Sequence, residues 1–281
     1  MAKAEQITDV LTYHGEGCGW HPGAQAVKFV DMLAGDVLTL RPDGGADRQH
    51  VGDVAAAWRA RVGGGMVVAV ERGFVLVDAD GVIEWSTEAW TDASVRMNEG
   101  ACDPLGRFYC GSMAFDARPG AGTVWRLDPD RSVRAVLDGF TIPNGLVWSL
   151  GGTLAYHIDT PTNRIDCYDF DPELGLVDRR PVVEVTGGGP DGMTIDADGN
   201  LWVAIWGGGA VHCYTTDGEL LQVVHVDARQ VSSCAFGGPD LDRLYVTTSR
   251  ESLGEDDDPK AGALFAAEVG VRGVPLRPFG G

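Results

Sequence analysis

A short pattern that recurs along the chain constrains its fold more than any other feature. In each copy a tight turn, usually containing glycine, is followed by an alternating apolar strand; the copies begin at DPLGRFYCG (103–111), SLGGTLAYH (149–157), DADGNLWVA (196–204) and PDLDRLYVT (239–247). The aligned turn positions are 46, 47 and 43 residues apart: Gly106, Gly152, Gly199 and Asp242. A period in the forties with about four short strands per unit is typical of β-propeller blades.

A second strand recurs six times between these turns. It opens on a small or polar residue and closes on a turn, and its copies begin near positions 35, 73, 122, 163, 209 and 262. The last step is lengthened by an acidic insertion, Glu251–Lys260. Six copies predict an all-β fold, a six-bladed β-propeller with four-stranded blades around a central channel, in a single domain over residues 1–281. We expect an N-terminal strand to pair with C-terminal ones, which removes exposed sheet edges.

Charge and cysteine usage narrow the classes of partner and compartment. The 281 residues carry a formal charge of −19, which disfavours nucleic acid and anionic membranes as partners because both would repel the chain. The six cysteines form no C-x-x-C pair, so they read as buried apolar residues rather than as a zinc or redox site. The N-terminus lacks the apolar run of a signal peptide, and we expect a cytoplasmic protein.

Four polar residues lie just ahead of the recurring turns and nearly in register with the blades. Asn98 and Asn144 are 46 residues apart, Asp191 follows 47 residues later, and Glu16 precedes Asn98 by 82 residues, or two blades. Residues one blade apart occupy equivalent places around the axis, so these four side chains should converge in the channel. Each is followed by glycine within two positions, which permits close approach of backbone and ligand.

Two carboxylates and an amide oxygen are hard donors that suit one divalent ion, Ca²⁺, Mg²⁺, Mn²⁺ or Zn²⁺. Three protein ligands leave positions open for water or substrate, as catalysis requires. An Asn-Gly or Asp-Gly pair alone is more often a turn, and a lone Glu16 or Arg96 is more often a solvated charge or an ion-pair former. The metal-site hypothesis therefore rests on the regular spacing of the four polar residues along the chain.

Several longer segments carry a family resemblance. They are GEGCGW (15–20), RMNEGACDPLGRFYCGSM (96–113), IPNGLVWS (142–149), PDGMTIDADGNLWVAIW (190–206) and SSCAFGGPDLDRLYVTTS (232–249). Together they resemble the senescence-marker/gluconolactonase/luciferin-regenerating enzyme family, whose members are six-bladed propellers. The resemblance implies a metal-dependent sugar lactonase whose partner is a small-molecule sugar lactone.

The resemblance also implies roles for individual residues. Glu16, Asn144 and Asp191 would bind the metal, with Asp191 also serving as the catalytic general base. Arg96 and Asn98 would contact the hydroxyl and ring oxygens of the lactone. Asp116, which follows the GSM segment at 111–113, would contact substrate where some relatives carry glutamate.

Two other functions stay open at this point. The same propeller could hydrolyse aryl esters or organophosphates with its metal, or bind calcium without turnover. Arg96 and Asn98 favour hydroxyl-rich substrates over apolar esters. The carboxylates in register argue against a purely structural propeller.

Overall fold

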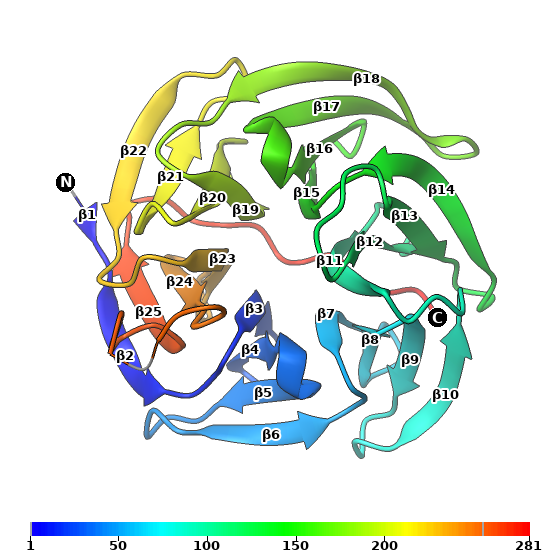
Figure 1. Ribbon diagram of the computed structural model, residues 1–281, viewed down its shortest axis with the longest axis horizontal. Coiled ribbons are helices and arrows are strands. Elements are labelled where there is room, and N and C mark those ends of the chain that lie inside the picture. Colours follow the sequence, from blue (N-terminus) through cyan, green and yellow to red (C-terminus); the bar gives the residue numbers. More distant parts are fainter. Residues whose placement is uncertain (1, 255) are drawn as a thin grey trace.

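The computed structural model describes residues 2–254 and 256–281 and has the predicted architecture. Six antiparallel sheets stand around a common axis like the blades of a propeller (Figure 1). The third strand of every sheet is one of the six recurrent strands found in the sequence. Among the described residues the only helices are two short 3₁₀ turns, η1 (Met32–Ala34) and η2 (Thr160–Thr162). None of these is long or apolar enough to cross a membrane.

The first four blades each contain four strands in chain order from the axis outward. Blade I consists of β3 (Gly15–His21), β4 (Ala26–Asp31), β5 (Asp36–Leu40) and β6 (Ala46–His50). Blade II consists of β7 (Ala55–Ala60), β8 (Met66–Val70), β9 (Gly73–Val77) and β10 (Ile83–Glu88). Blade III consists of β11 (Val95–Cys102), β12 (Phe108–Ala114), β13 (Gly122–Leu127) and β14 (Val133–Phe140). Blade IV consists of β15 (Pro143–Trp148), β16 (Leu154–Asp159), β17 (Arg164–Asp171) and β18 (Gly175–Glu184).

The last two blades include strands from the N-terminus, which closes the ring as predicted. Blade V consists of β19 (Gly189–Ile195), β20 (Leu201–Trp206), β21 (Ala210–Tyr214) and β22 (Leu220–His225), with β1 (Ala2–Lys3) parallel to β22 at its edge. Blade VI consists of β23 (Val231–Gly237), β24 (Arg243–Thr248), β25 (Ala263–Glu268) and β2 (Glu5–Val10). The antiparallel pairing of β2 with β25 fastens the first residues to the last blade.

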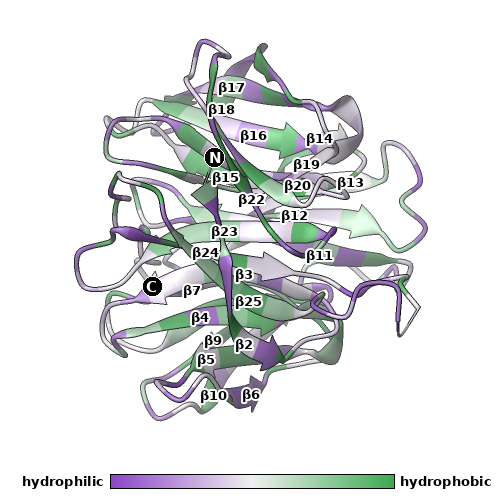
Figure 2. Cartoon of the chain, turned by 90° about the vertical axis from the view of Figure 1, so that its left-hand side faces the viewer, coloured by the Kyte–Doolittle hydropathy of each residue, from purple (hydrophilic) through white to green (hydrophobic). Residues whose placement is uncertain are grey.

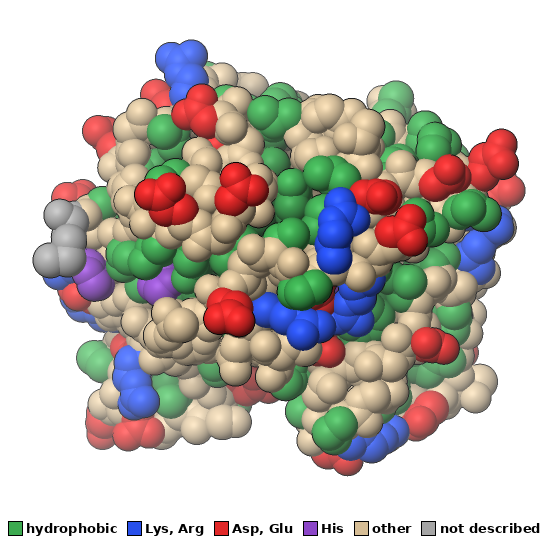
Figure 3. Space-filling model, turned by 90° about the horizontal axis from the view of Figure 1, so that it is seen from above, with side chains coloured by type: hydrophobic (Ala, Val, Ile, Leu, Met, Phe, Trp, Pro, Cys, Tyr) green, Lys and Arg blue, Asp and Glu red, His purple; other side chains and the backbone are tan. Residues whose placement is uncertain are grey.

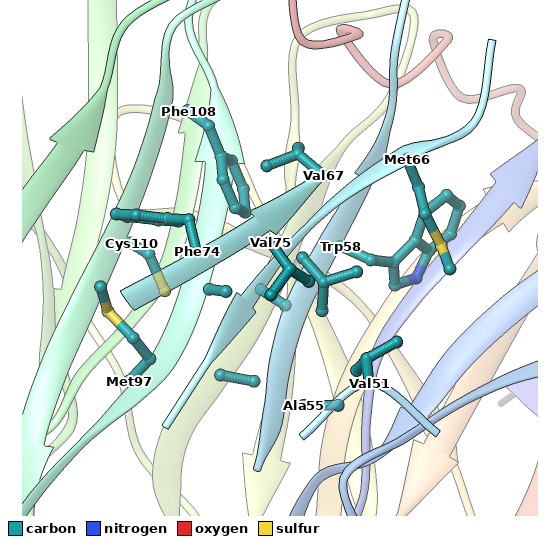
Figure 4. Packing of buried hydrophobic residues seen from close by; sticks show 14 of the residues in the cluster. Val51, Ala55, Trp58, Met66, Val67, Phe74, Val75, Met97, Phe108 and Cys110 are labelled. Carbon is teal, nitrogen blue, oxygen red and sulfur yellow. The ribbon is translucent and has the colours of Figure 1, made fainter. Parts of the chain in front are cut away.

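The core consists of apolar layers between neighbouring blades, and it explains why the inner strands read as apolar runs. In Figure 4, side chains of blade II pack against those of blade III, and the rings of Phe74 and Phe108 meet edge to face with centroids 5.8 Å apart. Trp58 is fully buried in the same cluster and donates a hydrogen bond to the carbonyl of Gly17 on blade I. Both faces of a blade are thus covered, and hydrophilic residues are concentrated in loops and outer strands (Figure 2).

The two ends of the axial channel differ. We call the end where the six inner strands begin the mouth, and the end where they turn into the second strands the rear. After β25 the C-terminal segment crosses the rear, as the red trace behind the ring in Figure 1 shows. Gly273 donates to the carbonyl of Leu241 on blade VI, and Phe279 donates to that of Ala60 on blade II. The segment therefore covers the rear of the channel and leaves the mouth free.

The negative charge is spread over the surface. Acidic side chains are scattered over the side of the molecule seen in Figure 3, with arginine and lysine side chains lying between them. All six cysteines are buried and free, as their apolar sequence contexts predicted.

Candidate functional site at the channel mouth

Each inner strand carries an irregularity in its pairing near the mouth. The regular register is interrupted between Glu16 and Gly19, Ala55 and Ala57, Met97 and Gly100, Pro143 and Leu146, Pro190 and Met193, and Val231 and Ser233. Bulges of this kind re-aim side chains and are frequent beside functional sites. Asn98, Asn144 and Asp191 directly follow the last paired residue, whereas Glu16 is itself that residue. The repeat in the sequence is therefore a repeated bulge in the structure.

Hydrogen bonds join the polar residues of adjacent blades. Asn98 Nδ2 donates to Asn144 Oδ1 over 3.0 Å, and Arg96 Nη1 donates to Asn98 Oδ1 over 2.8 Å. Asn144 Nδ2 donates to Thr160 Oγ1 over 2.8 Å, and that hydroxyl donates to the carbonyl of Pro190 over 2.7 Å. The chain of bonds runs from blade III through blade IV to blade V, where Asp191 follows Pro190.

The glycines beside these residues have a structural role that differs from the one expected. A Cβ on Gly145 would lie 2.8 Å from the carbonyl oxygen of Asp191, and one on Gly192 would lie 2.8 Å from the Cα of Ser233. These glycines let neighbouring inner strands approach one another. They thereby allow the polar side chains on these strands to come close together.

The environment of the two carboxyl groups at the mouth disfavours their ionised forms. Glu16 and Asp191 are buried, with exposed fractions of 4% and 5%. Burial raises the pKa of Glu16 well above its usual value, and the charges of Asp191 and Glu99 raise it further. Burial also raises the pKa of Asp191, and Glu99 and Glu251 add to the effect. Arg96 is the basic residue that offsets both.

This arrangement fits a divalent cation. Two buried carboxylates that repel each other gain most from a positive charge placed between them, which favours their ionised forms. The nearby Asn144 oxygen adds a neutral hard donor. No cluster of three or more His, Cys, Asp or Glu side chains in a metal-binding arrangement occurs within residues 2–254 and 256–281. The predicted set contains only two such residues and an amide.

Arg96 and His14 are two further buried polar side chains at the mouth. Burial lowers the pKa of Arg96, and the carboxylates of Glu251, Glu16 and Asp191 raise it in that order. His14 is neutral because burial, followed by the charge of Arg96, lowers its pKa to about 3. Its Nδ1 lies 2.6 Å from Ser249 Oγ, and its ring meets that of Trp206 edge to face at 5.9 Å.

Asp116 lies apart from the other predicted residues. Its side chain is 66% exposed and pairs with Arg118 at 3.1 Å. The residue of this turn that approaches the site is Phe115, whose ring centre lies 5.8 Å from the guanidinium carbon of Arg96. Because the strand ends at Ala114, alternation no longer dictates where these side chains point.

Three residues of the site were not singled out from the sequence. Thr160 links two blades from the 3₁₀ turn η2, Glu99 acts electrostatically on both carboxylates, and Glu251 lies on the loop after β24. Glu99 lies in the RMNEG segment (96–100), but regular alternation of side chains along a strand would point it away from the side that Asn98 faces. Only the bulge brings both toward the axis.

Comparison with known proteins identifies the family to which the chain is similar. The family model described as SMP-30/Gluconolactonase/LRE-like region matches residues 14–250. The chain is 37% identical over 281 residues to pentonolactonase XacC of Haloferax volcanii, covering 96% of both chains. It is 32% identical over 295 residues to regucalcin of Oryctolagus cuniculus, covering 99% of both chains. The crystal structure of a calcium-binding protein, regucalcin, from Agrobacterium tumefaciens superposes with a TM-score of 0.91 at 29% identity, over 99% of this chain and 97% of that one.

Proposed function

The chain belongs to the SMP-30/gluconolactonase/LRE-like family, and from that premise we propose that it is a lactonase that hydrolyses a small sugar lactone to the aldonic acid with the help of one divalent metal ion. The observation that carries the proposal is the meeting of two mutually repelling buried carboxylates, Glu16 and Asp191, at the mouth. The relative named pentonolactonase, aligned over nearly the whole chain, supports the substrate class.

The metal would be held by Glu16, Asn144 and Asp191. When bound, a divalent cation supplies Lewis acidity that polarises the lactone carbonyl and offsets the negative charge developing on its oxygen. Calcium, magnesium, manganese and zinc all accept this donor set.

The protein residues orient the substrate and move the proton. Arg96 is fixed by its hydrogen bond to Asn98, and its guanidinium and the Asn98 amide bind hydroxyl and ring oxygens of the sugar. Asp191 accepts a proton from the attacking water and returns it to the ring oxygen as the ester opens. The water oxygen forms a bond to the carbonyl carbon, the C–O bond to the ring oxygen then breaks, and the ring oxygen takes the proton from Asp191 to leave as a hydroxyl.

Calcium binding without turnover is the second candidate, favoured by the regucalcin structure described as a calcium-binding protein. One experiment separates the two. The purified protein is stripped of metal, and acid release from a panel of aldonolactones is followed with Ca²⁺, Mg²⁺, Mn²⁺ or Zn²⁺ restored singly. We expect turnover above the spontaneous rate with at least one metal and none without metal. Tight calcium binding with no turnover on any lactone would establish the second candidate.

A further inference from the structure

Arg96 and Glu251 carry opposite charges and lie on blades that stand on opposite sides of the ring. Arg96 lies on β11 of blade III, and Glu251 lies on the loop between β24 and β25 of blade VI. Figure 1 shows these blades on opposite sides of the axis. Among the acids near Arg96, Glu251 raises its pKa the most, ahead of Glu16 and Asp191.

The guanidinium of Arg96 is buried without forming an ion pair. Its exposed fraction is 4%, and Nη1 donates to Asn98 Oδ1 and to the carbonyl of Met97. None of the ion pairs within residues 2–254 and 256–281 includes Arg96, so Glu251 acts on it across a gap rather than in contact. Nη1 is the only guanidinium nitrogen that donates a hydrogen bond within the described residues, so the other N–H groups of Arg96 can donate to a polar ligand.

The backbone of Glu251 is fixed while its carboxylate stays available. Its N–H donates to Ser249 Oγ over 3.0 Å, and its carbonyl accepts from Gln230 Nε2 over 3.0 Å. Within residues 2–254 and 256–281 the basic atom within 4 Å of the carboxylate is His14 Nδ1, at 3.8 Å, too long for a hydrogen bond, so no described side chain holds the carboxylate of Glu251. The side chain is 33% exposed and open to solvent and ligand.

We propose that Glu251 is a specificity-determining residue whose carboxylate accepts hydrogen bonds from the hydroxyl groups of the sugar lactone, on the side of the ring opposite Arg96 and Asn98. This inference rests on the proposed lactonase function. A guanidinium only donates and a carboxylate only accepts, so a polyol, whose hydroxyls do both, can bridge the two. A lactone ring without hydroxyls cannot bond to Glu251.

The acidic insertion in the sequence thereby acquires a role. The substrate-binding acid expected from blade III was Asp116, but that side chain is 66% exposed and held by Arg118. Glu251 begins the insertion on blade VI, and its carboxylate lies 3.8 Å from His14, just ahead of Glu16. The two carboxylates are therefore competing candidates for one task, and they can be tested against each other.

The experiment compares the parent, Glu251→Gln, Asp116→Asn and Glu268→Gln on a hydroxylated aldonolactone and on valerolactone, which has no hydroxyl group. Glu268→Gln is the matched control, since it removes an exposed carboxylate from the rear end of blade VI. We expect Glu251→Gln to lower kcat/KM for the aldonolactone by roughly 10- to 100-fold, mainly through KM, because charged hydrogen bonds to substrate are lost. Its kcat/KM for valerolactone should fall far less than that for the aldonolactone, and a circular dichroism spectrum like that of the parent shows that the variant is folded.

The other outcomes overturn the inference in distinguishable ways. If the parent hydrolyses aldonolactones and Glu251→Gln does so equally well, the role of Glu251 is wrong and the lactonase function stands. An equal loss on both substrates would mean that Glu251 acts on the reaction centre and not on hydroxyls. A loss confined to Asp116→Asn would return the role to blade III. A parent inactive on every lactone would overturn the function together with this inference.

Discussion

The mouth and the rear of the channel are built by the same six strands and have opposite chemistry. At the mouth the strands place Glu16, Arg96, Asn98, Asn144 and Asp191 within one network of hydrogen bonds and charges. A few residues further along, they line a cavity of about 260 Å³ with largely apolar side chains and three cysteine thiols, closed by residues 274–277. Burial raises the pKa of these thiols and keeps them unreactive.

The contrast shows at which end of the channel buried acidic side chains lack compensating partners. Glu16 and Asp191 at the mouth repel each other in the absence of a cation, whereas the aspartates at the rear turns, such as Asp103, accept several hydrogen bonds. Asp196, at the rear end of β19, accepts hydrogen bonds from Trp202 Nε1 over 2.9 Å and from the N–H of Asn200 over 2.8 Å. Asp191 lies five positions earlier, before the same strand passes its bulge. One strand thus carries a candidate general base, Asp191, at one end and a structural aspartate, Asp196, at the other.

The largest effect should come from exchanging these two aspartates separately for asparagine. Asp191→Asn is expected to lower kcat by roughly 100- to 10,000-fold, the usual contribution of a general base, with a melting temperature no lower than that of the parent. Asp196→Asn is expected to destabilise the fold by about 1–3 kcal/mol, because buried donors lose a charged acceptor, with kcat per folded molecule unchanged. Initial rates and denaturant unfolding measure the two quantities.

The reverse pattern would break the comparison. Unchanged turnover in Asp191→Asn removes this residue from the mechanism, and lost turnover in folded Asp196→Asn would mean that the rear takes part in catalysis.

The next effect concerns Glu16, for which binding and stability should move in opposite directions. Glu16→Gln removes a proposed ligand and should weaken metal affinity by at least roughly 100-fold, the upper range found for outer-shell changes. The metal-free variant should be more stable than the metal-free parent by roughly 1 kcal/mol, because the repulsion from Asp191 and Glu99 is relieved. Calorimetric metal titration and thermal unfolding without metal test the two parts. Identical titrations for both proteins would reject Glu16 as a ligand.

The sequence predicted well those positions of the site that recur once in each blade. Turn positions such as Gly106 and Gly152 mark each blade, and the spacing from Asn98 to Asn144 follows from that repeat. Ring closure by β2 also follows, since a propeller with an open edge would expose unpaired strands. The sequence alone therefore predicts the residues whose positions follow from the repeat.

What the sequence could not predict lies where the repeat breaks. The direction of the Glu99 side chain depends on a bulge that interrupts the regular alternation of side chains along β11. The position of the Asp116 side chain depends on its ion pair with Arg118. Glu251 lies in an insertion with no counterpart in the other blades. The crossing of the rear by residues 273–280 uses backbone hydrogen bonds, which leave no side-chain pattern to read.

The smallest effect should come from Glu99, which faces the rear cavity from the strand that carries Asn98 at the mouth. Burial raises its pKa from 4.5 to about 7, partly offset by Arg59, and its Oε2 has no hydrogen-bond partner within the described residues. A folded-state pKa above the unfolded value contributes stability below pH 4.5, and that contribution is lost as pH rises toward 7. Glu99→Gln should abolish this loss, so between these pH values the parent should lose roughly 1–3 kcal/mol relative to the variant. Urea unfolding of both metal-free proteins across this range measures the difference, which includes the effect of the Glu99 charge on the titration of Glu16 and Asp191. Parallel stability curves would show that the carboxyl of Glu99 is solvated in the folded protein, and the rear cavity would then be as polar an environment as the mouth.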